Sequence, residues 1–276
     1  MSKACLIIMD GLGYTTCVQE CGYLESAVEE GKARRWKMLS CLPTISAPLY
    51  ESIHTGVSPQ MHGILNNESL RASHYENIFS VLSSAGKTAG VVAHSYFHTL
   101  YGGSQYDPFL HCEIDDINEP IAYARYYSMD GYRVENACVP AEIDLCAQLW
   151  GLAKRNTPDY LLLHTCSIDT LGHWFTSDSK EYRVQAFKVD CALAILIPKL
   201  IEAGYQVLVT ADHGMNTDGH HGGNQSILRE VPFYYFGNQN TPEETDVLDQ
   251  RAIAPSVLSI LNLAVPGSMT VPGIFA

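Results

Sequence analysis

Residues 5–11 read Cys-Leu-Ile-Ile-Met-Asp-Gly, an apolar run that ends at an aspartate and a glycine. Similar short runs, each ending in a polar or glycine-rich turn, recur at residues 88–93, 160–164, 205–210 and 231–236. Runs of this length that are apolar throughout are typical of strands buried on both faces of a parallel sheet. Residues 5–9 therefore predict the first strand of such a sheet, with Asp10 at its carboxyl end.

Helix-like stretches lie between or after these runs, at residues 75–85, 141–155, 182–203 and 255–263. Gly86 and Gly204 stand where the first and third of them should stop, because glycine readily takes the left-handed conformation that ends a helix. Strand and helix patterns alternate along most of the chain. This alternation predicts an α/β fold with a central, mostly parallel sheet and helices on both faces.

Residues 96–136 interrupt the alternation, because this segment is dense in Tyr, Asp, Gly and His. We interpret it as a small cap-like insertion over the carboxyl edge of the sheet. The chain has 276 residues and neither an internal repeat nor a low-complexity tract. At roughly 100–200 residues per domain, this length fits one large domain or two small ones, and we favour a single domain spanning residues 1–276.

The composition is acidic, since 17 Lys and Arg stand against 30 Asp and Glu, for a net charge of −13. Nucleic-acid polymers are held by Lys and Arg, so this balance disfavours them as partners. No stretch approaches the ~20 apolar residues of a membrane span, and the N-terminal apolar run is too short for a signal peptide. Nine cysteines without a CxxC pair predict reduced thiols. We therefore expect a cytoplasmic protein with no membrane partner.

Charged side chains follow several of the predicted strands. Asp10 ends the first, Asp169 comes shortly after the third, and Asp212 and His213 follow the fourth. A single aspartate at a strand end most often forms a turn or caps a helix. Because ligands bind at the carboxyl edge of parallel sheets, these groups together indicate a binding site.

Two local spacings point to metal binding. Asp169 and His173 are four residues apart, so that both are able to face one point from a helical turn or tight loop. His220 and His221 precede the pair Gly222–Gly223, and glycines let the backbone approach a ligand closely. A mixed set of carboxylates and imidazoles suits Zn²⁺ best and Mn²⁺ next.

Hydrolysis at phosphorus also needs a nucleophile, and Ser46 lies in the stretch Pro-Thr-Ile-Ser-Ala-Pro at residues 43–48. A serine hydroxyl is a poor nucleophile until a metal or base lowers its pKa. The alternative is that Thr44 and Ser46 only cap the helix that follows.

Taken in order along the chain, these motifs resemble the alkaline phosphatase superfamily, and within it the nucleotide pyrophosphatase/phosphodiesterase-like branch. The matching stretches are residues 7–13, 42–48, 54–64, 168–173, 211–215, 220–223 and 229–237, and the resemblance continues through residues 254–263 near the C-terminus. The resemblance implies that superfamily's fold, two neighbouring metal ions, and a serine that forms a phospho-enzyme intermediate. Ser46 occupies the position of that nucleophile.

The same resemblance implies a role for each candidate ligand. One metal would be held by Asp10, Ser46, Asp212 and His213, and the other by Asp169, His173 and His221. His220 is the rival of His221, but the family pattern places the ligand directly before Gly-Gly. One metal would activate Ser46 and the other would stabilise the leaving oxygen.

Two departures from the family pattern bear on the substrate. The branch usually carries an asparagine three residues after the nucleophile, where this chain has Leu49. A diester-specific donor would then have to come from Asn66, Asn67 or a backbone N–H. Sulfatases carry an arginine where this chain has Tyr50, which argues against sulfate-ester hydrolysis.

The leading hypothesis is a two-metal phosphodiesterase or nucleotide pyrophosphatase that acts on a small phosphorylated substrate. A phosphomonoesterase of the same superfamily is one alternative, and a metal-binding module that has lost catalysis is the other. Among the other histidines, His62 is expected to fix its local turn. His94 and His98 are expected either to line the pocket or to serve the structure.

Overall fold

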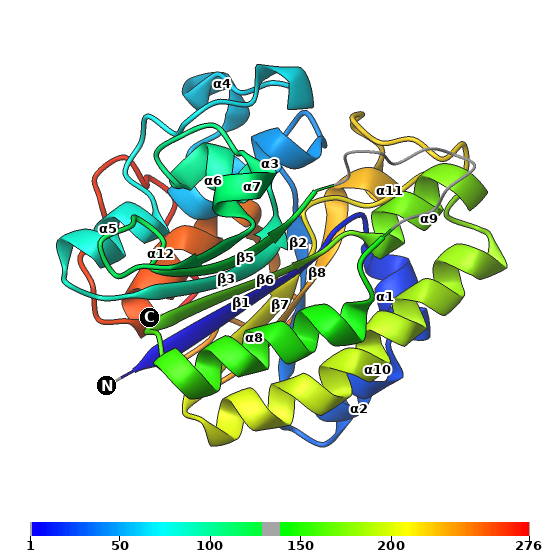
Figure 1. The fold of residues 1–276 in the computed structure, drawn as a ribbon. Helices are drawn as coiled ribbons and strands as arrows, with labels where there is room; N and C mark the ends of the chain where they lie inside the picture. The colour runs from blue at the N-terminus through cyan, green and yellow to red at the C-terminus, as the bar shows by residue number, and fades with distance from the viewer. Residues whose placement is uncertain (1, 129–138, 276) are drawn as a thin grey trace.

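The computed structural model describes residues 2–128 and 139–275. Its strands are β1 (Lys3–Met9), β2 (Arg34–Leu39), β3 (Ala89–His94), β4 (Glu113–Asp115), β5 (Tyr123–Tyr127), β6 (Tyr160–Thr165), β7 (Tyr205–Thr210), β8 (Glu230–Phe236) and β9 (Val247–Asp249). Within the described ranges these nine strands form one sheet in the order β4-β5-β3-β6-β1-β7-β8-β2-β9 (Figure 1).

The helices follow the strands and turns of this sheet. They are α1 (Tyr14–Glu20), α2 (Gly22–Glu29), α3 (Ser46–Thr55), α4 (Pro59–His62), α5 (Ile78–Ser84), α6 (Tyr96–Tyr101), α7 (Pro108–His111), α8 (Glu142–Asn156), α9 (Ser167–Phe175), α10 (Lys180–Glu202), α11 (Ser226–Arg229) and α12 (Ile253–Ile260), with 3₁₀ turns η1 (Asn67–Ser69) and η2 (Gln250–Ala252).

The centre of the sheet is parallel, as predicted. Strands β5, β3, β6, β1 and β7 all run in one direction. All five predicted strands are present, but β8 runs antiparallel to both β7 and β2. A parallel neighbour needs a crossover of a dozen or more residues that returns the chain to the opposite edge. Residues 211–229 are long enough for such a crossover, but they form the candidate ligand loop and the short α11 instead of a crossover helix, so the chain turns back as an antiparallel strand.

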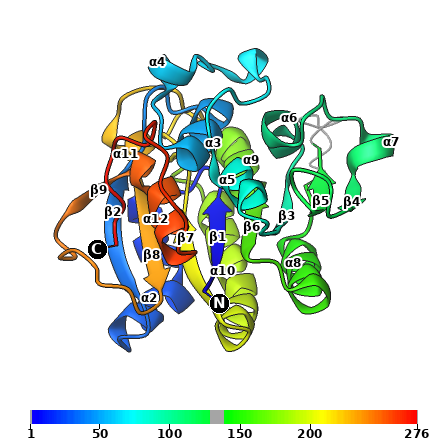
Figure 2. The same cartoon turned by 90° about the vertical axis from the view of Figure 1, so that its left-hand side faces the viewer.

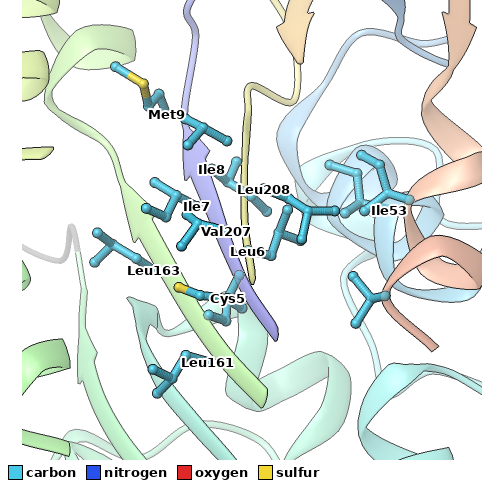
Figure 3. Close-up of a cluster of buried hydrophobic side chains, with 14 of the residues drawn as sticks. Cys5, Leu6, Ile7, Ile8, Met9, Ile53, Leu161, Leu163, Val207 and Leu208 are labelled. Carbon is cyan, nitrogen blue, oxygen red and sulfur yellow. The ribbon is translucent and has the colours of Figure 1, made fainter. Parts of the chain in front are cut away.

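Helices cover both faces of the sheet (Figure 1). Helices α1, α2, α8 and α10 lie on one face, and α3, α5 and α12 lie on the other, as the turned view also shows (Figure 2). Every residue of β6 is buried, as are all residues of β1 except Lys3. On one face of the sheet, Leu6 of β1 and Leu208 of β7 lie toward Ile53 of α3, whereas Leu161 and Leu163 of β6 lie on the other face (Figure 3). The predicted α/β architecture is therefore confirmed.

The four predicted helices are present as α5, α8, α10 and α12, with ends shifted by a few residues. Capping explains two of these shifts. Asn77 accepts a hydrogen bond from the N–H of Ser80 (3.0 Å), so α5 begins at Ile78. Ser179 accepts one from the N–H of Tyr182 (3.1 Å) at the start of α10. Gly86 and Gly204 follow these helices with φ of +68° and +87°, as the helix-stop prediction requires.

The predicted insertion at residues 96–136 lies partly outside the described residues. Its described part forms α6 and α7, together with β4 and β5, which extend the sheet beyond β3. Helix α6 lies near the carboxyl ends of β3 and β5 (Figure 2). The segment thus adds an edge to the sheet, and its role as a cap stays a prediction.

Two further sequence expectations concern thiols and membrane spans. The eight cysteines in the described ranges are free thiols, and Cys138 lies outside those ranges. Among the described helices, none is both long enough and apolar enough to cross a bilayer.

Candidate active site

The candidate ligands meet at the carboxyl edge of the sheet because β1 lies between β6 and β7. Asp10 directly follows β1, and its N–H donates to the carbonyl of Thr165 at the end of β6 (3.1 Å). Asp169 lies in the first turn of α9, just beyond β6. Asp212 and His213 follow β7 and are fully buried. Three segments that are far apart in the sequence therefore converge at this edge.

A close backbone approach holds two of these segments together. Gly11 has φ of +76°, and a Cβ atom at this position would lie 2.7 Å from both Cα and Cβ of Asp169. No side chain fits at that distance, so only glycine allows the β1 turn to pack against the start of α9.

Within the described residues, the side chains form two groups suited to a cation. One comprises Asp10, Asp212 and His213, and the other comprises Asp169, His213 and His221; in each group the ligand atoms lie within 4.8 Å of one another. His173 adjoins the second group, because its Nε2 is 3.4 Å from Oδ2 of Asp169 and 3.1 Å from Nε2 of His221. The structure thus brings together the six predicted Asp and His ligands, and the seventh predicted ligand, Ser46, is described below.

The backbone holds the three histidines in one tautomer. Nδ1 of His173 donates to the carbonyl of Gly219 (2.8 Å), Nδ1 of His221 to that of Thr44 (2.8 Å), and Nδ1 of His213 to that of Gly214 (3.0 Å). A carbonyl oxygen only accepts, so each Nδ1 carries a proton, and Nε2 is the nitrogen that each ring turns toward the cluster. Metal-binding histidines are held in this way by carbonyl groups.

The carboxylates present acceptors to the same space. Oδ1 of Asp10, Oδ1 of Asp169 and Oδ2 of Asp212 are buried and accept no hydrogen bond. Burial raises the pKa of Asp10 to about 8, helped by the charge of Asp169, and it raises the pKa of Asp212 well above its usual value. Buried acceptors that face lone pairs are costly unless a cation joins them. The donor set therefore fits divalent metal ions.

The three histidines of the site differ in their pKa values. The hydrogen bond that His173 donates to the carboxylate of Asp169 raises the pKa of His173 to about 9, so this ring carries a second proton that a metal ion would displace. Burial instead lowers the pKa of His213 to about 3 and lowers that of His221. His213 and His221 are thus neutral imidazoles, the form in which histidine binds a metal.

Of the two adjacent histidines, His221 lies at the site. Its ring stacks on His213 with centroids 3.9 Å apart, whereas His220 is exposed. The placement agrees with the choice of His221 made from the Gly-Gly pattern.

Ser46 is the first residue of α3, and its Oγ lies 3.3 Å from Nε2 of His213. The alternative that Thr44 and Ser46 cap this helix is wrong, because Ile45 is the N-cap residue and no side-chain hydrogen bond caps the helix. The Oγ of Thr44 instead donates to the carbonyl of Gly223 (2.9 Å). Ser46 is thus free to face the two carboxylate–histidine groups.

A cavity of about 190 Å³ opens beside Ser46. It is lined by Asp10, Ser46, Tyr50, Asn67, His94, Tyr96, Cys166, Asp169, Thr170 and His173. Leu49 is fully buried in the core and does not line it. Asn67 does, and its Oδ1 accepts from the N–H of Ala47 (3.0 Å). The side-chain amide of Asn67 is therefore held next to Ala47, the neighbour of the candidate nucleophile Ser46, while Asn66 caps η1 instead.

The remaining histidines divide as expected into structural and pocket residues. His62 accepts from the N–H of Ile64 (3.2 Å) and contacts Ser52, so it fixes its turn. His94 lines the cavity. His98 lies elsewhere, with its ring stacked on His111 at a centroid distance of 4.1 Å.

The sequence alone did not indicate three residues that lie behind Asp10. Tyr50 donates to Oδ2 of Asp10 (2.5 Å), and Nε2 of His164 lies 3.2 Å from the same oxygen. Tyr127 in turn lies 2.8 Å from Nδ1 of His164. The only signal was that His164, a polar residue, ends an otherwise apolar strand.

Comparisons with known proteins agree with this geometry. The family model for type I phosphodiesterase / nucleotide pyrophosphatase matches residues 4–230. The catalytic subunit of GPI ethanolamine phosphate transferase 3 from Mus musculus is 22% identical over 88% of this chain, which spans about a fifth (21%) of that relative's length. Ectonucleotide pyrophosphatase/phosphodiesterase family member 1 from Mus musculus is 28% identical over 63% of this chain and 19% of its own length.

Solved structures share the fold. Murine ectonucleotide pyrophosphatase / phosphodiesterase 5 superposes with a TM-score of 0.71 at 12% identity, covering 99% of this chain and 97% of that one. An alkaline-phosphatase-like fold, as the resemblance implied, is therefore confirmed. Because the family model matches most of the chain, this protein belongs to the type I phosphodiesterase / nucleotide pyrophosphatase family, within the alkaline phosphatase-like superfamily.

Proposed function

We propose that the chain hydrolyses phosphodiester or pyrophosphate bonds of a small substrate, with two divalent metal ions and Ser46 as nucleophile. One observation carries the proposal: Ser46 lies 3.3 Å from Nε2 of His213, beside buried oxygens of Asp10, Asp169 and Asp212 that accept no hydrogen bond. Family membership supports the reaction class.

Asp10, Asp212 and His213 would hold one metal together with Ser46, and Asp169, His173 and His221 would hold the other. The mixture of imidazole and carboxylate favours Zn²⁺, with Mn²⁺ next. When bound, such a pair lowers the pKa of the nucleophile and neutralises charge on the attacking and leaving oxygens.

The chain's own residues position the reaction. Ser46 Oγ attacks phosphorus, the bond to the leaving oxygen breaks, and the phosphoryl group is carried on Ser46 until water releases it. The side-chain amide of Asn67 lies where it is able to donate to a phosphoryl oxygen. Asn67 thus supplies the hydrogen-bond donor that the family's asparagine provides at the position where this chain has Leu49.

The cavity lining favours a diester over a monoester. Among the described residues that line it, none is Lys or Arg. A monoester is a dianion near neutral pH, whereas a diester carries one negative charge. The metal ions alone are able to balance the single charge of a diester. A dianionic monoester would favour an additional Lys or Arg, which this lining does not offer among the described residues.

The proposal is tested with bis-aryl and mono-aryl phosphates in the presence of Zn²⁺ or Mn²⁺. We expect faster turnover of the diester, and we expect Ser46→Ala to abolish turnover while most of the metal stays bound. Full turnover by Ser46→Ala would contradict the nucleophile assignment. Faster turnover of the monoester would favour a phosphomonoesterase, and two bound metals without turnover would favour a metal-binding module.

The substrate is expected to be small, because a chain with a net charge of −13 repels long polyanions such as nucleic acids. The cytoplasmic location and the lack of a membrane partner stay predictions from the sequence.

A further inference from the structure

Behind the candidate metal centre, three side chains form a continuous line that the proposed chemistry does not use. Tyr50 on α3 donates to Oδ2 of Asp10 (2.5 Å). His164 at β6 places Nε2 2.8 Å from the hydroxyl of Tyr50 and Nδ1 2.8 Å from the hydroxyl of Tyr127 on β5. Tyr50 and His164 are buried, and the ring of Tyr50 stacks on Phe97 with centroids 4.6 Å apart.

The direction of these hydrogen bonds follows from the charge of Asp10. As a metal ligand Asp10 is ionised and only accepts, so the hydroxyl of Tyr50 must donate to it. The oxygen of Tyr50 then accepts from Nε2–H of His164. Nδ1 of His164 is left as an acceptor for the hydroxyl of Tyr127 at 2.8 Å, nearer than the carbonyl of His164, which the same hydroxyl reaches at 3.1 Å. The other tautomer of His164 would draw the Tyr50 proton away from Asp10, so the ionised carboxylate sets the order of the whole line.

The line also selects which oxygen of Asp10 is left for a metal. Oδ2 receives the hydroxyl of Tyr50 and lies 3.2 Å from Nε2 of His164. Oδ1 receives no hydrogen bond and lies 3.6 Å from Nε2 of His213, on the side of the other ligands. One oxygen is therefore held by the protein, and only the other is directed into the site.

We propose that Tyr50, His164 and Tyr127 are positioning residues that hold Asp10 as a one-oxygen metal ligand, with Tyr127 acting from the far end of the line. The proposal rests on the metal site of the proposed function. Removal of a residue that hydrogen-bonds to a metal ligand commonly lowers the metal affinity by about 10–100-fold.

The test measures Zn²⁺ dissociation constants of the metal-free chain by competition with a coloured chelator. Asp10→Asn should lose zinc binding at one of the two sites, and the dissociation constant that is missing in this variant is the one for the site of Asp10. We expect Tyr50→Phe to raise this constant about tenfold, and Tyr127→Phe to raise it less. The second constant, for the site of Asp169, should stay within twofold of wild type in both variants.

A double variant tests whether the line acts as one unit. His164 is the link, because its Nε2 lies 2.8 Å from the hydroxyl of Tyr50 and 3.2 Å from Oδ2 of Asp10, while its Nδ1 lies 2.8 Å from the hydroxyl of Tyr127. Once His164 is replaced, Tyr127 no longer reaches Asp10, so His164→Phe/Tyr127→Phe should match His164→Phe alone. Tyr160→Phe is the matched control, because it removes another buried tyrosine hydroxyl that lies 3.5 Å from a histidine, His54, away from the site. It should leave both constants unchanged.

Three results would overturn the proposal: an unchanged constant in Tyr50→Phe, effects of His164→Phe and Tyr127→Phe that multiply in the double variant, or equal loss at both sites. The last would mean general damage to the fold, which thermal unfolding of the same samples also reports. Because affinity is measured without substrate, these results leave the proposed hydrolysis standing. Wild-type protein that binds zinc at neither site would overturn both proposals.

Discussion

The Nε2 atoms of His173 and His221 lie 3.1 Å apart, although each ring donates its Nδ1 proton to a backbone carbonyl. Two imidazole nitrogens at this distance need a positive charge beside them. Asp169 adds carboxylate oxygens to the same space, with its Oδ1 3.6 Å from Nε2 of His221. The nitrogen and oxygen atoms of these three side chains therefore face one space that suits a cation. The predictions below concern this space, the cavity beside it and one buried carboxyl, that of Glu51.

Zinc should stabilise the metal-free chain strongly. A ligand present at 100 times its dissociation constant adds about 2.7 kcal/mol to the free energy of unfolding. For a chain of this size, each kcal/mol raises Tm by about 2–4 °C. We therefore expect thermal scans with Zn²⁺ to show a rise of about 5–10 °C for one filled site. Mg²⁺ prefers oxygen ligands and should give a smaller rise; equal rises with both ions would contradict the assignment of histidine ligands.

Replacing His221 should remove one metal, whereas replacing its neighbour should not. The ring of His221 lies in the site, and that of His220 is exposed. We expect His221→Ala to bind one equivalent of zinc fewer than wild type, measured as metal content after dialysis. His220→Ala is the matched control and should keep both equivalents. A loss in His220→Ala alone would reverse the assignment.

Replacing Asn67 should slow turnover of a diester. Removal of a single donor to a reacting oxygen commonly costs about 100-fold in kcat, and we expect a loss of that size in Asn67→Ala. Asn66→Ala, which removes the cap of η1, should lower stability by about 1 kcal/mol while keeping kcat within tenfold of wild type. Similar values of kcat for the two variants would show that Asn67 does not contact the phosphoryl group.

Glu51 should make stability depend on pH. Burial raises the pKa of this carboxyl from 4.5 to about 7, against hydrogen bonds donated by Ser73 and Tyr101. Between these two pKa values the folded chain keeps a proton that the unfolded chain has released. The free energy of unfolding therefore falls as pH rises from about 4.5 to about 7, by roughly 3 kcal/mol for this group.

Glu51→Gln removes this dependence and preserves the shape of the side chain. We expect the variant to gain stability relative to wild type as pH rises from 5 to about 8, measured by denaturant unfolding. Glu68→Gln, at an exposed carboxylate, should show no such trend. A constant difference between Glu51→Gln and wild type across this range would contradict the raised pKa.

The sequence predicted those features of the fold that depend on residues close together in the chain. Apolar runs found the five strands at the heart of the sheet, and the polar residues after them found Asp10, Asp169 and Asp212. It missed β2, whose central residues alternate between partly buried and fully buried, and it missed the antiparallel direction of β8. The direction of a strand depends on where the preceding loop leaves the chain, which no pattern within the strand records.

The candidate site shows the same division. Residue types and spacing alone predicted a metal-binding edge, and the order of the motifs indicated the family, which is confirmed, and a candidate nucleophile, Ser46, which stays a prediction. Only the tertiary structure decided that Asn67 lines the cavity, that three carbonyls set the histidine tautomers, and that Tyr50, His164 and Tyr127 stand behind Asp10. These are contacts between segments up to about 180 residues apart. They arise because a buried polar atom takes whichever partner the packed fold brings within reach, and a linear pattern carries no record of that choice.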